Sequence, residues 1–219
     1  MRAENKFFSK HFYKKWLKEA NPKIKDWLKK ETTYLENNIR PGSKILDFGC
    51  GFGRHIKLLA RSAKKVVGID INIDMIKKAK ANLHKFKNVE LFVQDAKKLG
   101  FPSNSFDYVI CMTNTFGNIP EIQLRAVREM KRVCKKNGRI LISVYSSNAL
   151  EIRKKDYKKV GLHITYIKGI KEDGIIYTRE GLVSEQFTKP LLQRIFEKAG
   201  IKNKIFELNS ISFLCVLTK

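Results

Sequence analysis

The feature that most constrains this chain is a short apolar segment that leads directly into a turn of alternating glycines. The segment reads Ile45-Leu46-Asp47-Phe48-Gly49-Cys50-Gly51-Phe52-Gly53, and a helical pattern follows at 54–62. Glycine permits a sharp turn and lets a ligand approach the backbone without meeting a Cβ atom. The start of the next helix offers unpaired N–H groups and a positive dipole end. The pattern predicts a buried strand, a ligand-binding turn and a helix, in that order.

Strand and helix patterns continue to alternate along the chain. Strands are expected at 44–48, 65–69, 89–93, 106–112 and 139–145, with helices at 54–62, 74–83 and 121–134. Such alternation is typical of a parallel sheet covered by helices on both faces. Because crossovers between parallel strands are right-handed, the expected fold is a doubly wound α/β sheet.

Two acidic residues close consecutive strands of this predicted sheet. Asp70 follows the strand at 65–69, about 20 residues beyond the first glycine, which is the spacing at which a carboxylate meets ribose hydroxyls. Asp95, followed by Ala96, closes the strand at 89–93, where an acid can accept a hydrogen bond from an adenine amino group. Each acid has a plainer explanation as a helix N-cap or an exposed loop residue. The presence of both at neighbouring strand ends favours ligand binding.

Together these residues resemble the class I S-adenosylmethionine-dependent methyltransferases. The resemblance rests on 45–53, Asp70, Asp95-Ala96, Phe106-Asp107-Tyr108-Val109-Ile110, Glu129-Met130-Lys131-Arg132-Val133 and 136–139. It covers residues 43–146 closely and 188–218 more loosely. The resemblance implies a Rossmann-like seven-stranded sheet with helices on both faces and an antiparallel last strand. It also implies S-adenosyl-L-methionine as the cofactor.

The resemblance further assigns roles around that cofactor. The glycines would line its methionine side, Asp47 would help hold its amino group, Asp70 its ribose, and Asp95 with Ala96 its adenine. The whole cofactor-binding set expected in this way is Asp47, Gly49, Cys50, Gly51, Gly53, Asp70, Ile71, Asp95, Ala96 and Met112.

A nicotinamide-dependent dehydrogenase is the main alternative with a similar fold. The dinucleotide-binding pattern requires a third glycine at the position that Arg54 occupies. That loop must also seat a pyrophosphate, which S-adenosylmethionine lacks. The spacing therefore favours the smaller cofactor, although fold analogy alone does not decide the function.

We expect one domain made of four parts. Residues 1–42 would form an N-terminal helical cap, 43–145 the cofactor-binding core, 146–187 a substrate-side insertion, and 188–219 a C-terminal helix and two strands. The expected elements of the last two parts are a basic helix at 149–160, strands at 163–168 and 175–179 around a turn at Glu172-Asp173-Gly174, a helix at 188–199, and strands at 204–208 and 212–217.

The loop after the fourth strand, 112–118, contains the candidate catalytic residues. Methyltransferases that act on nucleic-acid amino groups carry an Asn or Asp, two prolines and an aromatic residue here. Asn114 and Phe116 offer the amide and the ring, but the prolines are missing and the spacing is shorter by one. Asn114 would accept a hydrogen bond from an exocyclic amine and Phe116 would stack on a base. Alternatively, Asn114 shapes the loop and Phe116 packs in the core.

The one-sided charge of the chain favours RNA as the partner. Lys and Arg number 45 against 21 Asp and Glu, which gives a net charge of +24 and an isoelectric point near 9.9. Such a field attracts polyanions. Two basic clusters are expected near the active site: Lys10, Lys14, Lys15 and Lys18 interleaved with Phe8, Phe12, Tyr13 and Trp16, and Arg153, Lys154, Lys155, Lys158 and Lys159 in the insertion.

Three functions remain open from the sequence. The favoured function is methylation of a base amino group in RNA, because the chain also has some likeness to archaeal ribosomal-RNA methyltransferases that act on cytosine N4. The first alternative is a small-molecule N- or O-methyltransferase. The second is a methyltransferase-like RNA-binding protein without catalytic activity, against which the intact glycine loop and both acids argue.

Other sequence features exclude several classes of protein. Cys50, Cys111, Cys134 and Cys215 are scattered, so neither a zinc site nor a disulfide framework is expected, and we expect no metal. The four histidines are dispersed as well. No apolar run approaches the roughly 18–20 residues that span a membrane, and the N-terminus does not resemble a signal peptide. We therefore expect a cytoplasmic protein without a membrane partner.

Overall fold

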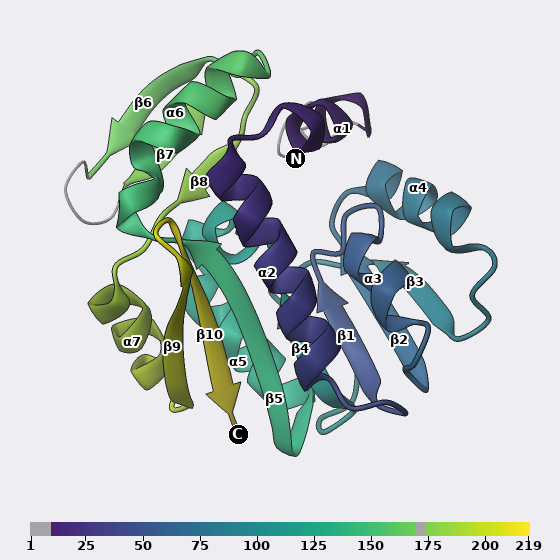
Figure 1. Ribbon diagram of the computed structural model, residues 1–219. Coiled ribbons are helices and arrows are strands. Elements are labelled where there is room, and N and C mark those ends of the chain that lie inside the picture. Colours follow the sequence, from purple (N-terminus) through teal and green to yellow (C-terminus); the bar gives the residue numbers. More distant parts are fainter. Residues whose placement is uncertain (1–9, 170–173) are drawn as a thin grey trace.

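Seven strands form the central sheet of the computed structural model, which describes residues 10–169 and 174–219, with side chains described from residue 15 (Figure 1). The strands are β1 (Lys44–Phe48), β2 (Lys65–Asp70), β3 (Val89–Val93), β4 (Phe106–Cys111), β5 (Cys134–Tyr145), β9 (Lys202–Asn209) and β10 (Ser212–Thr218). Their order is β3-β2-β1-β4-β5-β10-β9, and β10 is antiparallel to both of its neighbours. The expected seven-stranded sheet with an antiparallel last strand is confirmed.

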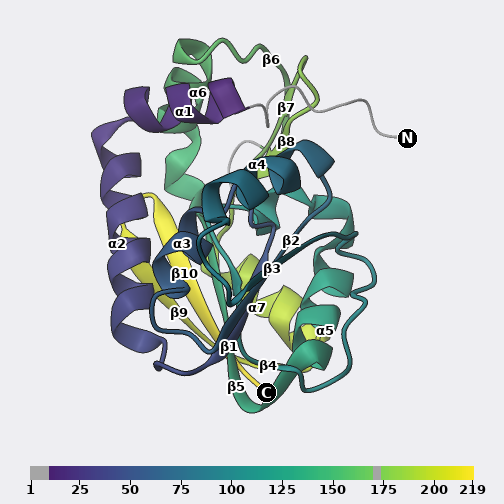
Figure 2. The same cartoon turned by 90° about the vertical axis from the view of Figure 1, so that its right-hand side faces the viewer.

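Helices cover both faces of this sheet, and Figure 2 shows the three layers edge on. The helices are α1 (Lys10–Glu19), α2 (Pro22–Asn38), α3 (Arg54–Leu59), α4 (Ile73–Leu83), α5 (Gln123–Val133), α6 (Leu150–Lys159) and α7 (Lys189–Lys198). One buried core joins α5 and α7 to the sheet, and a second joins α2, α3 and α4 to its other face. None of the described helices is long and apolar enough to cross a membrane.

Two element boundaries have identifiable causes. Pro22 is the first residue of α2, and the side chain of Asn21 caps this helix by accepting from the Lys23 backbone N–H at 3.0 Å. β5 begins at Cys134, whereas the sequence predicts this strand only from residue 139. Pairing with β4 shifts register across this stretch, between Phe106 and Tyr108, which accommodates the extra residues as an irregularity in the strand.

Residues 146–187 contain α6 and a second, three-stranded antiparallel sheet. Its strands are β6 (Ile164–Lys168), β7 (Ile175–Thr178) and β8 (Val183–Glu185). The sequence did not indicate β8, which is only three residues long. Glu172 and Asp173 of the expected turn lie outside the described residues. A third buried core, which includes Trp16, Trp27, Tyr145 and Tyr157, joins this insertion to the N-terminal helices.

Candidate active site

The glycine loop follows β1 at the carboxyl edge of the sheet. Its first residues are tied to the neighbouring strand, because the backbone N–H groups of Gly49 and Cys50 both donate to the Ile69 carbonyl, at 2.8 and 2.9 Å. Gly49 has φ +76° and Gly51 has φ +53°, which is backbone that only glycine adopts readily. A Cβ atom on Gly49 would overlap the methyl group of Thr115, whereas one on Gly51 would meet nothing within 4 Å. The absence of a Cβ atom at Gly49 thus lets the loop after β4 pack closely against the glycine loop, and Gly51 faces open space.

Asp70 closes the loop from the end of β2. One of its carboxylate oxygens accepts from the Gly51 N–H and the other from the Asn72 N–H, both at 2.9 Å. Burial raises the pKa of Asp70, and these backbone hydrogen bonds oppose that rise. The side chain that caps α4 is Asn72, which accepts from the N–H groups of Asp74 and Met75. Asp70 is therefore not the N-cap of α4, and the carboxylate faces the glycine loop.

Asp47 is buried beside this loop with an unsatisfied oxygen. The residue is 2% exposed, and its Oδ2 atom has no hydrogen-bond partner among the described residues. Burial raises the pKa of Asp47 to about 7; the Arg54 charge opposes that rise, and the charges of Asp70 and Glu31 add to it. A buried oxygen without a partner is costly. A cationic ligand group would satisfy this oxygen and fits the site that the sequence predicts.

The remaining cofactor-binding candidates differ in exposure. Ile71, at the end of β2, is 69% exposed, which leaves an apolar side chain available to a ligand. Asp95 is exposed and accepts from the Lys97 backbone N–H at 2.8 Å. This contact agrees with the plainer explanation, in which Asp95 is an exposed loop residue. Ala96 packs partly against the core, and Met112 and Cys50 are buried. The Gln94 N–H donates to the Asp70 carbonyl, which keeps the ends of β3 and β2 together.

The loop after β4 does not present Asn114 and Phe116 to an acceptor in the way the sequence predicts. The amide nitrogen of Asn114 donates to Ser184 Oγ and the Glu185 carbonyl, at 3.0 and 3.1 Å. Its amide oxygen accepts from the Tyr145 N–H at 3.1 Å. Phe116 is fully buried, with its ring 5.8 Å from that of Phe187. These contacts agree with the alternative, in which Asn114 shapes the loop and Phe116 belongs to the core.

One buried acidic residue next to the site, Glu31, was not predicted from the sequence. Glu31 of α2 is fully buried, and its carboxylate receives the Arg54 guanidinium at 2.8 Å, the Thr113 N–H at 2.8 Å and the Thr113 hydroxyl at 2.9 Å. Burial raises the pKa of Glu31, but the neighbouring His55 and Arg54 lower it to about 2. A signal existed in the sequence, since Glu31 shares the face of α2 that carries Ile24 and Leu35.

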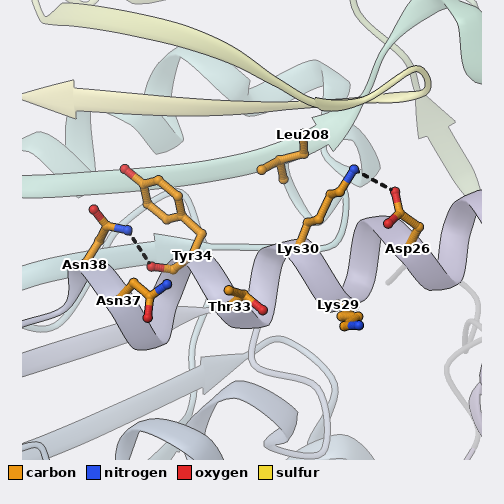
Figure 3. Close-up of a pocket in the computed structure, with 8 residues that line it drawn as sticks. All are labelled: Asp26, Lys29, Lys30, Thr33, Tyr34, Asn37, Asn38 and Leu208. Atoms are coloured by element: carbon orange, nitrogen blue, oxygen red, sulfur yellow. Dashed lines mark hydrogen bonds and ion pairs between the residues drawn. The ribbon is translucent and has the colours of Figure 1, made fainter.

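A surface hollow of about 380 Å³ lies away from the glycine loop, between α2 and β9 (Figure 3). Its lining residues are Asp26, Lys29, Lys30, Thr33, Tyr34, Asn37, Asn38 and Leu208. Lys30 and Asp26 form an ion pair at 3.1 Å within it. None of these residues belongs to the predicted site, so we do not assign the hollow to the binding of the cofactor.

The two basic clusters expected near the site are only partly realised. Lys155, Lys158 and Lys159 are exposed on α6, and Lys154 is half-buried and paired with Glu151. Arg153 is fully buried, which corrects its assignment to a surface cluster. In the N-terminal cluster, Trp16 packs in the core. Residues 8 and 9 lie outside the described chain, and the side chains of Lys10, Phe12, Tyr13 and Lys14 lie outside the described side chains.

All four cysteines are buried free thiols. Burial raises the pKa values of all four thiols above their ordinary value, so they are protonated near neutral pH. Within residues 10–169 and 174–219, no group of three or more metal-ligating side chains is present.

Comparisons with known proteins agree with this geometry. A family model described as a methyltransferase domain matches residues 45–138. The demethylmenaquinone methyltransferase of Staphylococcus aureus is 33% identical over 178 residues, which cover 75% of this chain and 70% of the relative.

Solved structures share the fold at lower identity. A protein from Pyrococcus horikoshii superposes with a TM-score of 0.70 at 22% identity, covering 96% of this chain and 99% of the other. A 1,6-didemethyltoxoflavin N1-methyltransferase from Burkholderia thailandensis, solved with S-adenosylhomocysteine, gives a TM-score of 0.64 at 12% identity, covering 96% of this chain and 90% of the other.

Proposed function

This chain belongs to the class I S-adenosylmethionine-dependent methyltransferases, and we propose that the acceptor of its methyl group is a small molecule. The observation that carries the proposal is the 33% identity to a demethylmenaquinone methyltransferase across three quarters of this chain. A quinol-type ring is therefore the first acceptor to test. This replaces RNA, which the sequence analysis favoured, as the leading candidate.

We assign the cofactor contacts residue by residue as part of this proposal. Asp47 holds the amino group, since its buried Oδ2 lacks a partner among the described residues and a cationic amine supplies one. Asp70 holds the ribose hydroxyls with the lone pairs that its two backbone hydrogen bonds leave available. Gly49, Gly51 and Gly53 line the methionine side. The expected contacts to the adenine ring and its surroundings are Cys50, Ile71, Asp95, Ala96 and Met112.

The cofactor supplies a methyl group activated by the positive sulfonium, which a nucleophile attacks in line. The chain contributes alignment and the exclusion of water. The glycine loop and the 113–115 turn meet where Thr115 packs on Gly49, so this contact fixes the position of the donor. In this proposal Asn114 and Phe116 hold the turn in place, and the acceptor enters beside it.

RNA remains the second candidate because of the net charge of +24 and the lysines on α6. The case is weaker than the sequence indicates, because Arg153 and Trp16 are buried. The glycine loop itself carries one aromatic residue, Phe52, which is half-buried.

One experiment separates these candidates. The purified protein is incubated with S-adenosylmethionine carrying a labelled methyl group, together with either a metabolite and quinone extract or total RNA. Mass spectrometry then locates the label in the small-molecule fraction or in digested nucleosides. Label in the small-molecule fraction supports the proposal. A labelled nucleoside, with no labelled small molecule, overturns it in favour of RNA.

A further inference from the structure

We propose that Glu31 is a positioning residue for the cofactor, which acts from helix α2 by fixing both the Arg54 side chain and the Thr113–Asn114 turn against the glycine loop. The proposal rests on the cofactor placement given above. Residue 31 lies outside the matched methyltransferase segment, 45–138, so the N-terminal helix would contribute to a site otherwise built from the core.

The geometry of Glu31 is that of a junction between three elements. Its Oε2 atom accepts from Arg54 Nη2, at the start of α3, and from the Thr113 hydroxyl, while its Oε1 atom accepts from the Thr113 N–H. Arg54 Nη2 also donates to the Thr113 hydroxyl at 2.8 Å. The three groups therefore form a closed ring of charge-assisted hydrogen bonds, which are the stronger kind.

The turn that Glu31 holds is strained. Thr113 and Asn114 are consecutive non-glycine residues with φ +52° and +59°, a conformation that costs non-glycine residues energy and persists only where the surroundings impose it. Glu31 clamps the first of these residues, and the side-chain hydrogen bonds of Asn114 clamp the second. Because Thr115 then packs on Gly49, the clamp determines where the turn meets the glycine loop.

Glu31 also contributes to the electrostatic surroundings of Asp47, after burial, Arg54 and Asp70. The charged groups that act on Asp47 are Arg54 from α3, Asp70 from β2 and Glu31 from α2, and the thiols nearby are Cys50 and Cys111. His55 of α3 also faces Glu31, at 3.6 Å, and burial lowers its pKa. Arg54 favours the ionised form of Asp47, whereas Glu31 and Asp70 disfavour it. A neutral residue at position 31 would remove one negative charge and leave the Arg54 charge less neutralised. The ionisation of Asp47 would then move to lower pH.

The test measures the affinity for S-adenosylmethionine by calorimetry between pH 5.5 and 8.5 for the full chain and three variants. Glu31→Gln removes the charge of the clamp, and Thr113→Val removes the hydroxyl while leaving every charge. Leu35→Ala is the matched control: Leu35 lies one turn further along α2 and is fully buried in the apolar core, and its side chain carries no charge and no hydrogen-bonding group. It lowers stability by a purely packing route.

We expect Glu31→Gln to weaken cofactor affinity by about tenfold or more, as when a supporting contact behind a binding side chain is lost. The pH midpoint of binding should also fall. Thr113→Val should weaken binding less and leave the midpoint unchanged, and Leu35→Ala should change neither. If Glu31→Gln and Leu35→Ala bind alike, with the same midpoint, Glu31 is only structural and the inference is wrong.

Should Glu31→Gln fail to fold, the Thr113→Val comparison with Leu35→Ala decides: weaker binding in the former alone supports the clamp, and equal binding contradicts it. Failure of the unsubstituted chain to bind S-adenosylmethionine is a distinct outcome. It would contradict the cofactor placement itself and with it the proposed function.

Discussion

The glycine loop and the loop after β4 touch each other at Gly49 and Thr115, yet they are held in different ways. Contacts from the next strand along the chain hold the glycine loop: β2 supplies the Ile69 carbonyl and the Asp70 carboxylate, 19 residues from Gly51. Distant segments hold the other loop, since Thr113 is bonded to a residue 82 positions away and Asn114 to one 70 positions away.

This difference explains which loop sequence patterns describe well. Glycine adopts positive φ without outside help, so a glycine loop carries its conformation in its own residues. Thr113 and Asn114 reach the same region of backbone only because α2, β5 and β8 supply hydrogen bonds. Changes in the first loop should therefore act directly on the cofactor. Changes in the second should act mainly on stability, and on the cofactor only through the contact of Thr115 with Gly49. The following predictions test that division, from the largest expected effect on cofactor affinity to the smallest.

Gly51→Val should reduce cofactor affinity by about 100-fold or more, because a branched residue is strained at φ +53° and its side chain would enter the space the ligand needs. Gly42→Val is the control, since Gly42 has φ +73° and equally open surroundings but lies before β1. It should carry the same strain and bind normally. Calorimetric titration with S-adenosylmethionine measures both, and normal binding by folded Gly51→Val would show that the pocket is elsewhere.

Asp70→Ala should weaken cofactor binding by about 1.5–3 kcal/mol, the cost of losing hydrogen bonds to a charged group. That corresponds to roughly 10- to 150-fold in affinity. Asp74→Ala, an exposed acid in the first turn of α4, serves as the control and should bind normally. Equal affinity of the Asp70 variant and the unsubstituted chain would remove Asp70 from the site.

Cofactor affinity should rise with pH through the pKa of Asp47, which is raised to about 7. Below that pH the carboxyl group is neutral and attracts a cationic amino group poorly; above it the carboxylate is ionised. Affinity should therefore increase by nearly tenfold per pH unit well below pH 7 and level off above it. Asp47→Asn should bind weakly and without this pH dependence. A flat profile in the unsubstituted chain would contradict the assignment.

Asn114→Ala should lower the free energy of unfolding by about 2–4 kcal/mol, because it leaves buried hydrogen-bonding groups of β5 and β8 without partners. Its effect on cofactor affinity should be only a few-fold. Asn37→Ala, on the exposed face of α2, should change neither property. Urea denaturation and cofactor titration give the two values. Loss of methyl transfer at full stability would instead support the catalytic role that the sequence predicts for Asn114.

Replacing Lys154, Lys155, Lys158 and Lys159 with Gln should leave cofactor affinity unchanged, because these residues lie on α6 and are not part of the glycine loop or of the strand ends that carry Asp70 and Asp95. A small-molecule methyltransferase should also keep its activity. RNA affinity and its salt dependence should fall in any case, since lysines release counterions from phosphates. Binding alone is therefore uninformative, and activity is the deciding measurement: its loss on an RNA acceptor would support the second candidate.

The sequence by itself determined the cofactor-binding core of this protein, residues 43–145. The apolar run ending in Asp47, the glycines at 49, 51 and 53, and Asp70 at the next strand end predicted the fold and the cofactor, because each signal depends on a few neighbouring residues. The alternation of strands and helices predicted the sheet for the same reason. The sequence did not predict boundaries that strand pairing sets, such as the start of β5, where Cys134 pairs with Phe106.

Only the tertiary structure decided which side chains pack against that core and which partners they have. In the sequence, Glu31 is one charged residue of a lysine-rich helix; in the structure, α2 packs on α3 and Glu31 binds Arg54. The sequence likewise leaves Phe116 available to a substrate, whereas in the structure its ring packs against that of Phe187. Asn114 and Arg153 likewise acquire their partners from segments far along the chain. Local patterns describe the conformation that a residue prefers. A buried polar contact depends instead on which distant groups the fold brings within hydrogen-bonding distance.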